Sequence, residues 1–200
     1  MQLPVPSAFY PELTDDRLRA IAMRLLDLRF STLNEMHSPY DDNYTREGTV
    51  FGRTRNMLVA LARKGPYSWF TLAHAGMDVT VNIGNVPVRY FRDDPKSPEK
   101  HGFFKRNAVD DLFALDDSAP VMWRFIVERA MAEDAEDVAH FIGYNVYQEP
   151  VSAWVYRPSK PTLHSLDGDT PPSTILPPAS VQLLDDDESS SDDRKAANNE

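Results

Sequence analysis

The chain has 200 residues, a length that suits one domain or one domain with a tail. It is 42% hydrophobic and 26% charged, as a globular protein is, and its formal net charge is −10. The absence of cysteine excludes disulfides, thiolate metal sites and cysteine nucleophiles. We see no signal peptide and no apolar run long enough to span a bilayer, so we expect a cytoplasmic protein that makes no membrane contact.

The acidity is concentrated near the C-terminus. Residues 161–200 hold nine acidic and two basic residues, which gives a net charge of −7. The rest of the chain holds 22 acidic and 19 basic residues, which gives a net charge of −3. Residues 159–200 are also rich in proline, serine and aspartate, which predicts a disordered acidic tail. We expect this tail to shield basic surface weakly at low ionic strength, or simply to keep the protein soluble.

The N-terminal third predicts an arm and a helix. Residues 1–13 contain three prolines and are expected to be extended. Thr14 is a plausible N-cap, and apolar residues recur after it at helical spacing. Arg29 falls among these apolar positions. We expect its stem to pack while its guanidinium reaches water, or the helix to fray before it; the alternative is a buried Arg29 paired with a carboxylate.

The next segment predicts a loop and a second helix. Residues 34–47 are polar and contain a proline, which is typical of a long loop. Residues from about 49 to 64 place apolar side chains on one helical face, and Gly65-Pro66 ends the helix.

The clearest signal is a hairpin between residues 77 and 90. Apolar residues alternate with polar ones on both sides of Gly84-Asn85, a pair typical of a tight turn. This turn pairs three sets of residues on one face: Ile83 with Val86, Val81 with Val88, and Val79 with Tyr90.

The strand before it, at about 69–74, has two candidate connections. A loop of residues 74–76 puts Gly76 at a left-handed position, whereas a loop of residues 75 and 76 keeps Phe70 and Leu72 on the apolar face of the hairpin. We favour the shorter loop, because a slip of one residue turns those side chains toward solvent.

Two helices are expected after a polar loop at 93–106. Asn107 is a candidate cap for a short helix that ends near residue 114, and Ser118 for a helix that ends near residue 131. The second helix is apolar on most sides, as a helix that is deeply buried or lies at an interface is. We therefore predict an interaction face, opposite Val121 and Phe125, that consists of Trp123, Val127 and Met131.

A last hairpin is expected from residues 138–147 and 151–157. The alternative is that the helix expected at 118–131 continues to about Phe141. The fold class is α+β: an antiparallel sheet of about five strands built from hairpins, with three to four helices mainly on one face. Residues 14–158 form the single globular domain, between the arm at 1–13 and the tail at 159–200.

No specific catalytic or metal motif is present, so we assign no catalytic residue, no metal ligand and no cofactor. We expect a non-catalytic protein-interaction or regulatory domain that binds a protein partner or self-associates. One alternative is nucleic-acid or nucleotide binding through cations interleaved with aromatic residues, with anion-binding candidates Arg53, Arg55, Arg63, Arg89 and Arg92. Another is a hydrolase or metal enzyme that uses His37, Asp41, His74 or His140.

Overall fold

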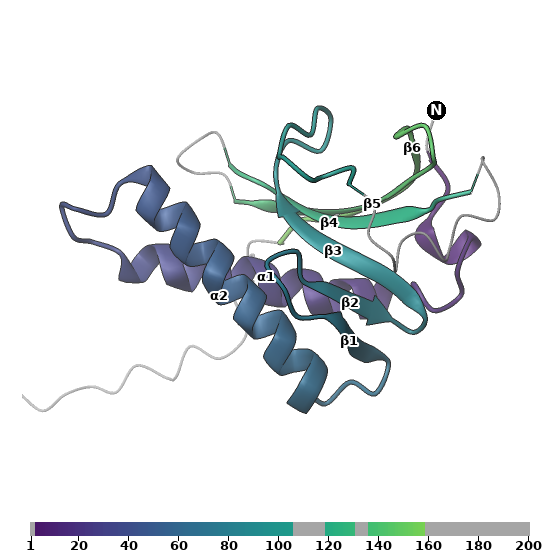
Figure 1. Ribbon diagram of the computed structural model, residues 1–200, viewed down its shortest axis with the longest axis horizontal. Coiled ribbons are helices and arrows are strands. Elements are labelled where there is room, and N and C mark those ends of the chain that lie inside the picture. The colour runs from purple at the N-terminus through teal and green to yellow at the C-terminus, as the bar shows by residue number, and fades with distance from the viewer. Residues whose placement is uncertain (1–2, 106–118, 131–135, 159–200) are drawn as a thin grey trace, which may run out of the picture. The chain divides into compact units, whose positions relative to one another are not determined.

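The computed structural model describes residues 3–105, 119–130 and 136–158, all within the unit Met1–Lys160. Figure 1 shows two crossing α-helices and a sheet. In chain order the elements are η1 (Pro6–Ala8), α1 (Asp15–Glu35), α2 (Asn43–Lys64), β1 (Phe70–His74), β2 (Thr80–Ile83), β3 (Val86–Arg92), β4 (Met122–Glu128), β5 (Val138–Tyr144) and β6 (Pro150–Tyr156).

The six strands form one mixed sheet in the order β1-β2-β3-β4-β5-β6. Every neighbouring pair is antiparallel except β3 and β4, which are parallel. The expected combination of helices and a sheet is confirmed, but five strands and a purely antiparallel sheet are wrong. Residues 93–121 join β3 to β4, because parallel strands cannot be connected by a tight turn.

The extra strand is β4, in a segment that was expected to be helical. Its residues are apolar on both sides because both faces of the strand are buried. A strand buried on both faces carries a continuous apolar run, which periodicity does not distinguish from a buried helix. The helix expected at 118–131 is therefore wrong over β4, and the helix expected at 107–114 lies outside the described residues.

The helix ends follow from their caps. The amide of Arg17 donates to the hydroxyl of Thr14 at 3.4 Å, which confirms the expected start of α1. Helix α2 begins at Asn43 rather than near residue 49, because the amide of Thr45 donates to the Asp42 carboxylate at 2.7 Å. The loop expected at residues 34–47 therefore spans only residues 36–42. Residues 43–47, which were expected in that loop, form the first turn of α2.

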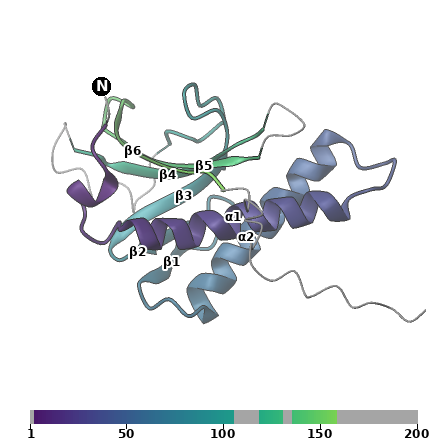
Figure 2. The same ribbon diagram turned by 180° about the vertical axis from the view of Figure 1, so that it is seen from behind.

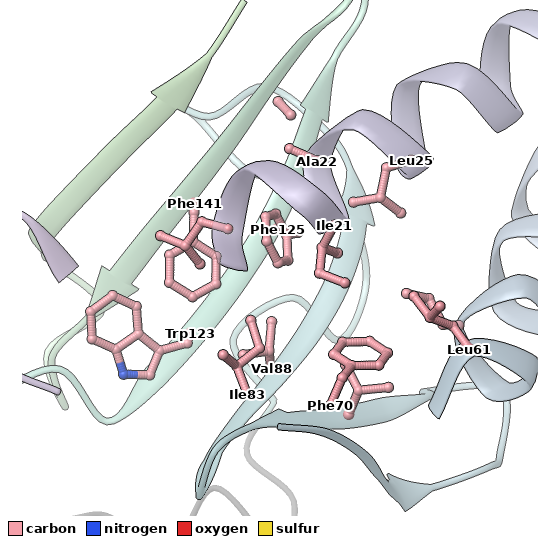
Figure 3. Close-up of a cluster of buried hydrophobic side chains, with 14 of the residues drawn as sticks. Ile21, Ala22, Leu25, Leu61, Phe70, Ile83, Val88, Trp123, Phe125 and Phe141 are labelled. Atoms are coloured by element: carbon pink, nitrogen blue, oxygen red, sulfur yellow. The ribbon is translucent and has the colours of Figure 1, made fainter. Parts of the chain in front are cut away.

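Two α-helices are present in the described ranges, against the three or four expected. Both contribute to one core with the same face of the sheet (Figures 2 and 3). Helix α1 contributes Leu18, Ile21 and Leu25, and α2 contributes Leu58 and Leu61. The sheet contributes Phe70, Val81, Ile83, Val88, Trp123, Phe125 and Phe141.

The central hairpin has the expected turn and register. Ile83 pairs with Val86 and Val81 with Val88, while Gly84 has a φ of 62°, a left-handed conformation that favours glycine. The third expected pair, Val79 with Tyr90, lies beyond the β2–β3 pairing, because β2 begins at Thr80. Strand β1 presents the expected face, but its register differs, since Leu72 pairs with Val81. The short loop at 75 and 76 is therefore wrong, and the connection to β2 runs from residue 75 to residue 79.

The last hairpin is confirmed, since β5 and β6 pair antiparallel from Ala139–Tyr156 to Tyr144–Pro150. This excludes a helix that continues to Phe141. The N-terminal segment lies against β6, because the Pro4 carbonyl accepts from the amide of Ala153 at 3.2 Å and from the hydroxyl of Ser152 at 2.9 Å.

A second, smaller core covers the opposite face of the sheet. Phe103, from the loop after β3, is buried there among Met122, Ile126, Ile142 and Tyr144. The ring of Phe103 meets those of Phe91, Phe104 and Tyr144 at centroid distances of 4.8, 4.8 and 5.5 Å. This aromatic cluster anchors the loop to the sheet.

Candidate binding cleft

A cleft of about 1130 Å³ lies among four segments. These are the first half of α2, the residues that lead into β2, the end of β3, and the loop after β3. The lining residues are Asn43, Tyr44, Thr45, Glu47, Gly48, Thr49, Val50, Phe51, Met77, Asp78, Val79, Arg89, Tyr90, Phe91, Arg92, Lys100, His101, Gly102 and Lys105.

One wall of the cleft is an apolar rim, formed by Tyr44, Phe51 and Met77. Their exposed fractions are 86%, 37% and 71%, so three large apolar side chains are exposed in the lining of one cleft. Tyr44, Gly48 and Phe51 follow at helical spacing, so they lie along one face of α2. A Cβ atom at Gly48 has no neighbour within 4 Å, so the helix surface is open there, a gap of one side chain in the row from Tyr44 to Phe51.

Arg55 holds the other part of this rim in place. Its Nε donates to the Gly76 carbonyl at 2.9 Å, and its NH2 donates to the Ala75 carbonyl. These bonds tie α2 to the loop that carries Met77. The position of Met77 beside α2 is therefore set by the backbone rather than by burial of its own side chain.

Another part of the cleft lining is cationic and comes from Lys100, His101 and Lys105. The loop that carries them is fixed to β3 by Arg89, whose NH1 donates to the carbonyls of Gly102 and Lys105 at 3.4 and 2.9 Å. Lys100, His101 and Lys105 are exposed. The loop backbone is thus held while its three cationic or titratable side chains face solvent.

Behind the cleft lies a cluster of four charged residues. Arg29 donates from NH1 and NH2 to the two carboxylate oxygens of Glu47, at 3.1 Å each, and from Nε to Asp137. Arg92 Nε lies 3.1 Å from Glu47 Oε2. The buried, paired Arg29 that we had set aside is therefore the correct alternative, and the snorkelling one is wrong.

This cluster joins α1, α2, β3 and the residues before β5. Burial by itself lowers the pKa of Arg29, but the hydrogen bonds from Glu47 and Asp137 outweigh it and leave the pKa above its usual value. Arg29 thus stays charged although only 2% of it is exposed. Tyr90 is nearby on β3, and burial raises the pKa of its hydroxyl to about 12.

The two carboxylates in the cleft lining have basic neighbours. Glu47 is paired with Arg29 and Arg92, and Asp78 lies 3.1 Å from the His74 ring. Within the described ranges, no carboxylate lies within 4.0 Å of the Lys100 or Lys105 ammonium group. The cleft therefore offers positive charge from the loop after β3.

The anion-binding candidates are only partly brought together. Arg89 and Arg92 line the cleft. Arg53 lies between the helices and pairs with Glu35, Arg55 binds the carbonyls described above, and Arg63 is exposed in the last turn of α2. Lys100 and Lys105 belong to the cations that the sequence indicated beside aromatic residues, although neither is among the five anion-binding candidates, and Tyr44 was not singled out. All three sit in segments that were expected to be loops, which carry binding residues often.

The interaction face expected from the helix at 118–131 is not at the surface. Trp123 and Val127 lie in β4 and are 2% and 1% exposed. The ring of Trp123 stacks on Phe141, with centroids 5.1 Å apart and planes 14° apart. Met131, the third member of that face, lies outside the described residues.

The candidate enzyme residues lie on separate elements. His37 and Asp41 are in the loop between the helices, His74 ends β1 beside Asp78, and His140 on β5 is 2.8 Å from Glu128. In the part of the chain that the structure describes, no three histidine or carboxylate side chains are grouped to hold a metal ion.

Comparison with protein families, with curated proteins and with solved structures finds no match for this chain. Among the described residues, no helix is both long enough and apolar enough to cross a membrane. The proposals below therefore rest on the geometry of the cleft.

Proposed function

We propose that this protein is a non-catalytic interaction domain that binds a segment of a partner protein in the cleft. The carrying observation is the apolar rim of Tyr44, Phe51 and Met77, which is exposed although the cleft around it is firmly built. Large aromatic side chains and methionine are enriched where proteins bind one another. An apolar rim above a polar floor suits a chain segment that has both kinds of side chain.

The size of the cleft supports the same proposal. Sites for small molecules usually enclose about 300–1,000 Å³ and bury most of the ligand. This cleft has about 1130 Å³, and the side chains at its rim are exposed rather than folded inward. A peptide segment fills such a site better than a single metabolite does.

The sheet edges are less suited to self-association. Strand β1 has five residues and an irregular register between Leu72 and His74, a feature that hinders pairing with another strand. On the other edge, the Pro4 carbonyl already accepts from the β6 amide of Ala153. We therefore place the partner in the cleft rather than on an edge.

The test is selection of peptides from a random displayed library with the full-length protein. Binding of the selected peptides is then followed by amide chemical shifts. We expect the largest shift changes around Tyr44, Phe51 and Met77, and weaker binding after replacement of Tyr44 and Met77 by serine. Tyr147→Ser is the matched control, because Tyr147 is 66% exposed and lies outside the cleft lining. Peptides that shift only residues outside the cleft contradict the proposal.

A further inference from the structure

We infer that the bound segment combines acidic side chains with one or two large apolar ones; this inference rests on the proposed function. The apolar side chains contact the rim of Tyr44, Phe51 and Met77. The acidic side chains pair with Lys100 and Lys105 in the loop after β3. The partner is thus a protein segment in which aromatic or aliphatic residues adjoin aspartate or glutamate.

The charge of the ligand follows from which charged side chains of the cleft already have a partner of opposite charge. Glu47 is already neutralised by Arg29 and Arg92, so it does not attract a basic ligand. Asp78 lies beside His74 at the apolar side. The lysines have no carboxylate partner in the described ranges, and electrostatic complementarity selects a ligand that supplies one.

The two lysines are also preorganised. Buried Arg89 donates to the carbonyls of Gly102 and Lys105, and fully buried Arg124 donates from Nε to the Phe103 carbonyl at 3.1 Å. With the Phe103 ring in the second core, the backbone between the lysines is fixed before any ligand binds. Less ordering is then required on binding, which favours affinity.

An acidic protein segment fits better than a nucleic acid. Phosphates also pair with lysine, but a nucleic acid carries a charge at every phosphate and binds tightly only where many cations contact it at once. The cleft offers two lysines that have no carboxylate partner in the described ranges. The thioether of Met77 and the gap at Gly48 suit an inserted side chain more than a flat base. We therefore take the nucleic acid as a competing outcome of the test.

The test measures fluorescence anisotropy of labelled 15-residue peptides with the full-length protein. One peptide has two aromatic residues and four acidic ones, and the others carry lysine or amides in place of the acids, or alanine in place of the aromatics. We expect the acidic aromatic peptide to bind about tenfold more tightly than each of the others at low salt.

Charge reversal makes the test specific to the cleft. In Lys100→Glu/Lys105→Glu we expect the acidic aromatic peptide to lose about tenfold in affinity and the lysine peptide to gain. The control is Lys64→Glu/Arg157→Glu, which changes the net charge equally at two exposed positions outside the cleft lining. It should retain the affinities of the unchanged protein.

Other results overturn the inference in distinct ways. If library peptides bind the cleft but show no preference for acids, the inference fails and the proposed function stands; if nothing binds the cleft, both fail. Tighter, steeply salt-dependent binding of a 12-residue oligothymidylate assigns the cleft to nucleic acid. A tenfold gain in peptide affinity after replacement of residues 185–188 by amides assigns it to this chain's own acidic segment. A dimer lost in the charge-reversed variant assigns it to a second copy.

Discussion

Arg29 on α1 and Glu47 on α2 are joined by two parallel hydrogen bonds of 3.1 Å. The guanidinium is 2% exposed and also pairs with Asp137, which lies 108 positions away in the chain. Because Glu47 in addition contacts Arg92 on β3, this one pair fixes both helices to the sheet directly behind the cleft. The pair thereby sets the relative positions of the two cleft walls that α2 and β3 provide.

Replacement of Arg29 by methionine should destabilise the fold by about 3–5 kcal/mol, because Glu47 and Asp137 lose a buried partner. Urea unfolding followed by circular dichroism measures the change. Arg19→Met is the matched control, since Arg19 forms an exposed pair with Asp15 on the same helix and should leave the midpoint nearly unchanged. A loss below about 1 kcal/mol for Arg29→Met would mean that the cluster contributes little to stability.

Alkaline pH should destabilise the protein through two tyrosines, Tyr90 and Tyr144, whose pKa values are raised by desolvation. The pKa of Tyr90 is about 12 in the folded state against 10.0 for an unperturbed tyrosine, so the native chain keeps a proton that the unfolded chain releases. Its contribution is complete below about pH 10 and is lost as the pH rises to about 12, which costs roughly 2.7 kcal/mol. Burial also raises the pKa of Tyr144, in the same direction.

Urea midpoints between pH 9 and 11.5 test this expectation. Tyr90→Phe should flatten the loss of stability with pH, and the double variant with Tyr144→Phe should flatten it further. Tyr40→Phe serves as the control, because the Tyr40 ring is 87% exposed. Parallel curves for Tyr90→Phe and the unchanged protein would refute the role of Tyr90.

Substitution of two glycines of α2 distinguishes an effect on helix stability from an effect on peptide binding. A Cβ atom has open space at both Gly48 and Gly52, so alanine at either position should stabilise the helix by about 0.5–1 kcal/mol. Only Gly48 lines the cleft, between Tyr44 and Phe51. We expect Gly48→Ala to weaken binding of the selected peptides several-fold and Gly52→Ala to leave it unchanged. Equal affinities for the two variants would exclude a role for the gap.

Gly143 and Trp123 test the placement of β4 as a strand. An alanine Cβ at Gly143 would lie 2.8 Å from the Trp123 ring and 2.8 Å from the Pro120 Cβ. We expect Gly143→Ala to destabilise by about 1–3 kcal/mol. Combined with Trp123→Phe, which frees space beside it, the total loss should be smaller than the sum of the two single losses. Strict additivity in urea unfolding would place the two residues apart.

The elements predicted correctly depend on residues that are close in the chain. The β2–β3 hairpin follows from the alternation around Gly84, since a two-residue turn leaves one register that buries Val81, Ile83 and Val88 together. The start of α1 follows from the Thr14 cap. The pairing of β5 with β6 likewise joins neighbouring segments through a short turn. In each case a few residues contain both the signal and the contacts that it specifies.

The tertiary structure decided what depends on distant contacts. Met122–Glu128 is a strand because β3 and β5 supply its hydrogen bonds, while the main core and Phe103 bury its two faces. Arg29 is buried because Glu47 and Asp137 arrive there from other segments. The cleft depends on the same long-range contacts, since its walls come from four separate stretches of the chain. Burying a charge or leaving strand amides unpaired costs free energy. Ion pairs and hydrogen bonds offset this cost only when these distant stretches of the chain come into contact.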